Sequence, residues 1–294
     1  SGLTDKAALR LLNIMKQVMD VAATAHLQML GGHIKTLSED IFRRLIEFLL
    51  YTKEAYAMTV VLHLYDRYYI HDESKYALPK ELTMKVLTHE SLFQNIDPRR
   101  RNTMDEYNWA IIAGAFVKKY PRSSLKLADK MLRHFGEEGT IVNSYNSHVV
   151  GILNEITRKN PRAVWNLVAK YIGPPIDSRA FHITGWLRGQ DLFSRGGEGA
   201  LRLIPLDEIW KWVDQDVEKR ARYLATSVPN LLFREEGKIC LARELLCRYG
   251  DSQGVRHSLM ANFSTEGWSG PASLHYQAKK QELLDFRKNE DNEE

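Results

Sequence analysis

The sequence predicts an all-α protein, and two observations support this. Apolar residues recur at spacings of three and four along most of the 294 residues, which places them on one face of successive helices. The 18 glycines and 9 prolines are fewer than an all-β protein with many turns usually needs. An apolar fraction of 44% and a charged fraction of 27% exclude a disordered chain, a collagen and a disulfide-rich secreted scaffold.

Helices are expected wherever this periodicity runs between glycine or proline boundaries. The first begins after Thr4 and stops at Gly31-Gly32. Pro121, Pro161 and Gly250 supply other clear limits. The expected helices are 4–30, 39–50, 52–69, 79–89, 103–120, 121–135, 144–159, 161–172, 205–228, 235–249, 251–263 and one from 271.

A repeat is the most informative pattern. Residues 116–122 read FVKKYPR and residues 156–162 read ITRKNPR, an offset of 40 residues. Each copy is a helix, a basic pair, an x-Pro-Arg corner and a second amphipathic helix. Helix pairs repeating at this interval are typical of HEAT and armadillo solenoids, although two copies can also match by coincidence in a helical protein. The prediction is an α-solenoid of antiparallel helix pairs.

A glycine-rich segment is expected to interrupt this array. Residues 173–205 hold six of the 18 glycines, which is typical of a hinge or of a functional loop. The predicted organisation is therefore an N-terminal array over 1–172, an irregular connection over 173–205, and C-terminal repeats with an acidic tail over 206–294.

Charge and cysteine usage indicate a cytoplasmic protein. The formal charge is +4, and the segment 281–294 holds six acids and two bases, so the remaining body carries +8. Cys240 and Cys247 lie about 10 Å apart along one expected helix, too far to pair. Buried free thiols are expected. No apolar run is long enough for a membrane span. The Ser1-Gly2 start without methionine indicates a piece of a longer protein.

No catalytic, cofactor or metal motif is found. The chain lacks a GxxxxGK[ST] phosphate loop, an HExxH pair and a GxSxG elbow. His63, Asp66, His71 and Asp72 are close in sequence, but their spacing does not bring three ligands together on one helix face. The sequence therefore assigns no catalytic residue, no cofactor and no metal ligand.

Two basic groups and one aromatic residue are the candidate partner-binding residues. Arg99, Arg100 and Arg101 form a cluster on an expected loop, which either meets phosphate or an acidic protein or is a solvated corner. Arg188 and Arg195 accompany the glycine-rich segment and are candidates for a basic groove wall. Trp268 lies on a Gly/Ser loop, as a recognition anchor or as a plug that seals the last helix.

The last third of the chain resembles a known family. The resemblance rests on three stretches, 214–221, 242–251 and NFSTEGWSGP at 262–271. They are similar to the C-terminal helical-repeat regions of bacterial STAND-type antiphage defence NTPases of the Avs group. The resemblance implies a sensor region that binds a phage protein, with the NTPase and effector parts outside this sequence.

The predicted function is a non-catalytic, protein-binding helical-repeat module, the sensor region of a larger defence protein. A solenoid leaves an extended surface free for a partner. The alternative is a nucleic-acid-binding helical array that uses its basic loops, since the body of the chain is moderately basic. An all-α enzyme with an unrecognised site is a third possibility.

Overall fold

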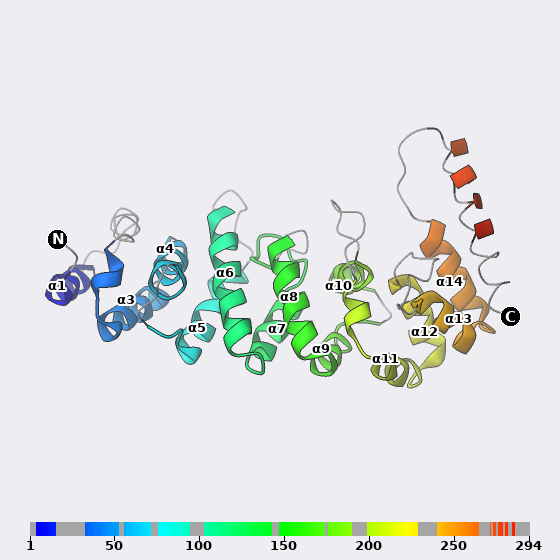
Figure 1. Cartoon of the computed structure of the whole chain (residues 1–294), viewed down its shortest axis with the longest axis horizontal. Helices are drawn as coiled ribbons and strands as arrows, with labels where there is room; N and C mark the ends of the chain where they lie inside the picture. The colour runs from blue at the N-terminus through cyan, green and yellow to red at the C-terminus, as the bar shows by residue number, and fades with distance from the viewer. Residues whose placement is uncertain are drawn as a thin grey trace. The chain divides into compact units, whose positions relative to one another are not determined.

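A computed structural model describes most of the chain, and within that part all regular structure is helical (Figure 1). No strand occurs among the described residues. The all-α class expected from the sequence is therefore confirmed. The described residues are 4–15, 33–52, 56–71, 76–94, 103–142, 147–173, 176–189, 199–228, 240–264, 271, 273, 274, 276–278, 280, 281, 284 and 285.

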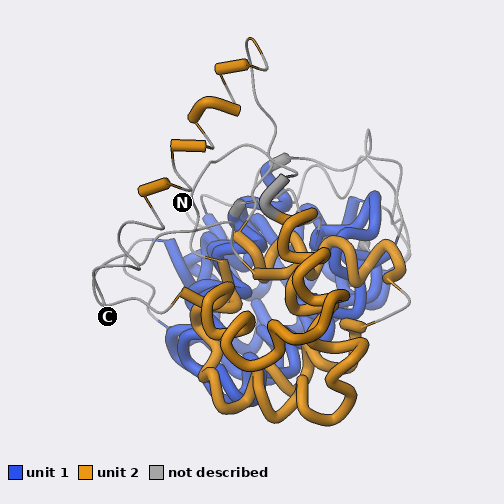
Figure 2. Tube along the Cα trace, turned by 90° about the vertical axis from the view of Figure 1, so that its right-hand side faces the viewer, with its two compact units in different colours: residues 1–164 blue, residues 165–294 orange. Residues whose placement is uncertain are grey.

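The chain divides into two compact units, residues 1–164 and 165–294 (Figure 2). Unit 1 contains α1 (Asp5–Met15), η2 (Ile34–Thr36), α3 (Glu39–Tyr51), α4 (Ala57–Tyr65), η3 (Asp66–Ile70), α5 (Lys80–Leu87), η4 (Glu90–Leu92), α6 (Thr103–Lys119), α7 (Ser124–Arg133) and α8 (Ser147–Lys159). The helix α9 (Pro161–Val168) contributes to both units. Unit 2 contains α10 (Ser178–Arg188), η6 (Ala200–Leu203), α11 (Leu206–Val213), α12 (Val217–Ser227), α13 (Leu241–Tyr249) and α14 (Gln253–Ser264).

Both consecutive and alternate helices pack on one another in unit 1. The helix α4 packs against α3 and α6, and α6 packs against α8, while α5 lies against α6 and α7 against α8. The indole of Trp109 is fully buried in this packing, and its Nε1–H donates to the carbonyl oxygen of Leu87 at 3.1 Å. The helix α6 thus packs against α4, α5 and α8 in the core of unit 1.

Hydrogen bonds join the proline corners of successive helix pairs. The Tyr120 hydroxyl, just before Pro121, donates to the carbonyl oxygen of Leu78 at 2.6 Å, just before Pro79. One repeat later, Asn160 Nδ2 donates to the carbonyl oxygen of Pro121 at 2.9 Å. The two matched copies thus form the same helix–corner–helix structure, and each corner binds the one before it.

The helix expected over 52–69 is regular only in part. It begins at Ala57 and closes in the π-helical turn η3, where the His71 N–H donates to the Asp66 carbonyl oxygen at 2.8 Å. A stack of aromatic rings covers this turn: Phe42 lies 3.8 Å from Tyr68 between ring centroids. The packing of large rings against α3 thus accompanies a wider helical turn that periodicity did not indicate.

Two tryptophans form the centre of unit 2. The rings of Trp165 and Trp212 meet edge to face with 5.6 Å between centroids, and Trp165 Nε1–H donates to the Glu208 carbonyl oxygen at 3.1 Å. Asn262 on α14 donates to two carbonyl oxygens at the end of α12, at 3.0 and 2.9 Å. These contacts fix α11 and α14 to their neighbours.

The expected single helix over 205–228 is wrong. It is divided into α11 and α12 by a turn at residues 214–216. The Asp216 side chain caps α12 by accepting the Lys219 N–H at 3.3 Å, and Arg220 donates to the Trp212 carbonyl oxygen at 2.9 Å. The turn lets α12 pack against α11.

Two further expectations need correction. The segment 173–205 is not irregular throughout, because α10 and η6 lie within it. Both thiols are free, but Cys247 is exposed and Cys240 half-buried. The prediction that both thiols are buried is wrong, because the packed face of α13 is formed by Leu241, Ala242 and Leu245.

Candidate functional site

Only one of the predicted partner-binding residues lies in the described part of the chain. Arg99, Arg100, Arg101, Arg195 and Trp268 all fall outside the described residues. The exception is Arg188.

Arg188 is the last residue of α10 and is half-buried. Gly189 follows with φ of 81°, a left-handed conformation that ends the helix and favours glycine. The backbone of Gly199 approaches the carbonyl groups of Leu187 and Arg188 so closely that a Cβ atom would collide with them. Arg188 thus lies where the end of α10 packs closely against the residue before η6.

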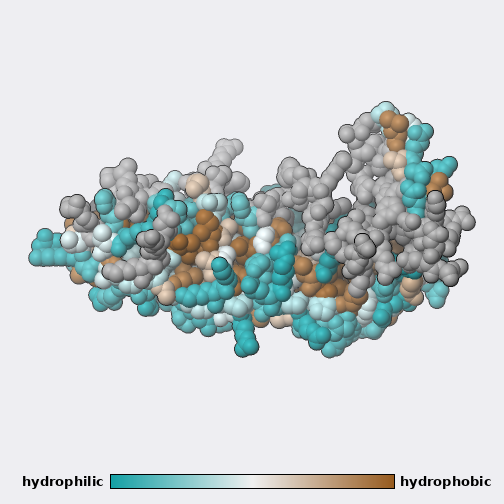
Figure 3. Space-filling view, viewed as in Figure 1, coloured by the Kyte–Doolittle hydropathy of each residue, from teal (hydrophilic) through white to brown (hydrophobic). Residues whose placement is uncertain are grey.

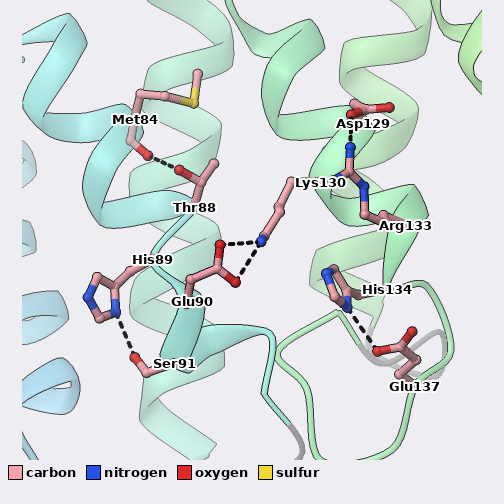
Figure 4. Close-up of polar contacts among 10 residues, drawn as sticks. All are labelled: Met84, Thr88, His89, Glu90, Ser91, Asp129, Lys130, Arg133, His134 and Glu137. Atoms are coloured by element: carbon pink, nitrogen blue, oxygen red, sulfur yellow. Dashed lines mark hydrogen bonds and ion pairs between the residues drawn. The ribbon is translucent and has the colours of Figure 1, made fainter. Parts of the chain in front are cut away.

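A charged cluster joins η4 to the last turns of α7 (Figure 4). Lys130 Nζ donates to both carboxylate oxygens of Glu90, at 2.7 and 2.9 Å, and lies 5.1 Å above the ring centre of Phe93. The hydrogen bond from Lys130 holds the pKa of Glu90 below its usual value. The Lys130 side chain is only 16% exposed, so this pair is partly shielded from water.

The neighbouring charged groups of this cluster are paired in the same way. Arg133 Nη2 donates to Asp129 at 2.7 Å, and His134 Nδ1 lies 2.9 Å from a Glu137 carboxylate oxygen. The His134 ring also contacts Phe93, with 5.4 Å between ring centroids. These two contacts are local to α7 and the residues after it, so the Lys130–Glu90 pair is the one that joins η4 to α7.

A serine–histidine pair lies beside the cluster (Figure 4). His89 Nδ1 is 2.8 Å from the Ser91 hydroxyl, and its Nε2 is 2.9 Å from the Leu50 carbonyl oxygen. A carbonyl oxygen only accepts, so Nε2 carries a proton; in the neutral ring Nδ1 then accepts from the Ser91 hydroxyl. The chain of bonds holds the start of η4 against the end of α3.

His63 and Asp66, which the sequence places close together, and Asp105 on α6 are all at least half-buried. Burial raises the pKa of the Asp66 carboxyl, and burial also lowers the pKa of His63. Asp105 is buried on α6 and accepts a hydrogen bond from the Thr59 hydroxyl at 2.8 Å. Across the described ranges, no three His, Cys, Asp or Glu side chains are placed to hold a metal ion.

An exposed apolar stripe on α6 is the strongest candidate for recognition. Met104 is 52% exposed and Tyr107 is 47% exposed, and Ile111 and Ala115 follow at helical spacing, half-buried. We call these four residues the α6 stripe. Apolar side chains gather over α4 and α6 in the space-filling view (Figure 3).

The neighbouring helix frames this stripe. The His148 ring on α8 meets the edge of Tyr107 with 5.9 Å between ring centroids. A Cβ atom on Gly114 would lie 3.5 Å from Ile152 Cδ1, which shows that α6 and α8 approach closely there. Sequence reasoning missed the stripe because α6 is apolar around most of its circumference, so that its solvent face could not be told from its packed face.

Comparisons with known proteins supply no relative: no family model, no curated protein and no solved structure matches the chain. Among the described residues, no helix combines the length and the apolar character that a membrane span requires.

Proposed function

We propose that this chain is a non-catalytic, protein-binding helical-repeat module and that the α6 stripe contacts the partner. The exposed Met104 and Tyr107 carry the proposal. Methionine and aromatic side chains are enriched in protein interfaces, where a few of them supply most of the binding free energy. Ile111 and Ala115 continue the apolar surface along the same helix.

The repeat supports an α-solenoid as the form of this module. The α6–α7 and α8–α9 pairs have the same corner, and the bond from Asn160 to Pro121 joins them. In a solenoid each pair contacts only its neighbours, and equivalent helices present a continuous surface. Repetition of these local contacts along the chain would give a solenoid.

The resemblance to STAND-type defence NTPases gives the partner class. It implies a sensor region, so the proposed partner is a phage protein that reports infection. The resemblance is the only support for this more specific role, and the α6 stripe supports protein binding independently of it.

The test is capture of a stoichiometric partner from phage-infected bacteria, followed by calorimetry with the purified partner. Met104→Ala with Tyr107→Ala should weaken binding by about 30-fold or more, because interface hot spots contribute about 2 kcal/mol or more each. The matched control is Tyr51→Ala with Met260→Ala, which removes the same side chains from other surfaces where they are 81% and 65% exposed.

Two results would contradict the proposal. One is a partner that both double variants bind as tightly as the native chain does, which would exclude the α6 stripe. The other is equal loss with both pairs, which would indicate a general effect of removing exposed apolar groups. Thermal unfolding of each variant checks that the fold is retained.

A further inference from the structure

The edge of unit 1 at which α6 and α8 end carries cations on each proline corner. Two basic residues end each helix, and an arginine follows each corner proline. All six side chains are exposed. We call them the corner ridge: Lys118, Lys119, Arg122, Arg158, Lys159 and Arg162.

Two corners of the ridge are fixed next to each other. Asn160 Nδ2 donates to the Pro121 carbonyl oxygen at 2.9 Å, so the cations around Pro121 and Pro161 belong to one surface. Lys119 Nζ reaches the Leu78 carbonyl oxygen at 3.3 Å, next to the corner at Pro79. The exposed Lys80 follows that proline and extends the row.

Helix stability explains only four of these six cations. Basic residues at a helix C-terminus are stabilising, which accounts for the pairs that end α6 and α8. A cation at the start of the next helix is unfavourable for the same reason, and Arg162 lies in the first turn of α9. In contrast, α11 follows Pro205 with Asp207 and Glu208 in its first turn, as helix stability favours.

The residue composition of the corner ridge favours a polyanion as its ligand. Apart from Asn166, every exposed residue in 118–126 and in 158–166 is a lysine or an arginine. Glu155 is the acid beside them, 3.3 Å from Lys159 and 3.8 Å from Arg158. These side chains are partly exposed, so the ion pairs are weak and leave both cations available.

We propose that the corner ridge binds the phosphodiester backbone of a nucleic acid, without reading the bases. Backbone binding needs rows of lysine and arginine and no apolar anchor. An acidic protein is less favoured because protein interfaces rely on aromatic and apolar anchors, and none is exposed at these two corners. This site is separate from the α6 stripe and does not depend on the function proposed for it.

The test is fluorescence anisotropy with labelled oligonucleotides of about 20 nucleotides and mixed sequence, single-stranded and duplex. The full chain should bind at about 50 mM NaCl and lose affinity steeply as salt rises. The ridge variant combines Lys118→Gln, Arg122→Gln and Arg162→Gln. It should weaken binding by about tenfold or more and reduce the slope of log K against log salt by about 2 to 3.

The control variant combines Lys6→Gln, Arg10→Gln and Lys170→Gln. It removes the same charge at exposed positions away from the corners and should change the affinity by less than about twofold. Circular dichroism checks that both triple variants are folded.

Three results would overturn the proposal. They are absence of binding by the native chain at low salt, equal loss in the ridge and control variants, and tighter binding of a glutamate polymer than of either oligonucleotide. The last result, if the ridge variant abolished it, would assign the ridge to an acidic protein.

Discussion

The helices α6 and α8 occupy equivalent places in the 40-residue repeat, yet they differ in residues that face solvent. Their packed sides match: Trp109 and Phe116 are buried in α6 where Val149 and Ile156 are buried in α8. At the ends of both helices, the same positions carry exposed basic pairs.

The side that faces solvent is different in the two helices. Ile111 and Ala115 of α6 correspond to Gly151 and Glu155 of α8. The apolar residues of α6 are thus replaced by glycine and by an acid that pairs with Lys159 at 3.3 Å. The repeat therefore keeps these packed positions apolar, whereas the solvent side differs at the two positions where the α6 stripe holds Ile111 and Ala115.

A substitution on the packed side of α6 should have the largest effect on stability. Trp109→Ala leaves a cavity and removes the hydrogen bond to Leu87, so it should lower the free energy of unfolding by about 3–5 kcal/mol. Urea unfolding followed by circular dichroism measures this. The control Met104→Ala, at an exposed position, should stay within about 0.5 kcal/mol. A small effect at Trp109 would show that α6 is not part of the core.

Giving the α6 stripe the residue that α8 has at the equivalent position should weaken partner binding without harming the fold. Ala115→Glu places an acid four residues before Lys119, as Glu155 precedes Lys159, and this pairing is mildly stabilising. Binding of the captured partner should fall by about tenfold or more, since a charge would be buried without a partner at the interface. The reverse change, Glu155→Ala, should leave binding within about twofold. Equal effects would remove the distinction between the helices.

The hydrogen bonds at the two proline corners should contribute equally to the free energy of unfolding. Tyr120→Phe removes the bond to Leu78, and Asn160→Ala removes the bond to Pro121. Each change should lower the free energy of unfolding by about 1 kcal/mol. Denaturant unfolding of the two variants and of the double variant measures this. Loss at one corner only would mean that the repeat is not energetically regular.

The charged tie between η4 and α7 should show the smallest effect, through pH. The pKa of Glu90 is lowered by Lys130, so its stabilisation is present above the ordinary glutamate pKa of about 4.3 and is lost as pH falls below it. The Glu90 side chain is 73% exposed, so the effect should be a few tenths of a kcal/mol. The native chain and Glu90→Gln should differ in stability at pH 7 and converge by about pH 3. A constant difference between pH 7 and pH 3 would exclude this linkage.

Prediction from the sequence succeeded where a local signal defined the element. Pro121 and Pro161 placed the corners, and the spacing of apolar residues placed the helices on either side. It failed at residues 214–216, where the periodic stripe runs through the turn without a break. It also failed for Cys247, because the packed face of a short helix depends on which neighbours cover it. The recognition residues chosen from motifs fall mostly outside the described residues.

The sequence by itself determined the helical class, the proline corners and the 40-residue repeat, because these follow from backbone restrictions and periodicity within short windows. Only the tertiary structure decided which side of α6 faces solvent, where the helix after Pro205 turns back, and how the corner cations come together. Those properties depend on contacts between residues about 40 positions apart, such as Asn160 with Pro121, that no short window contains.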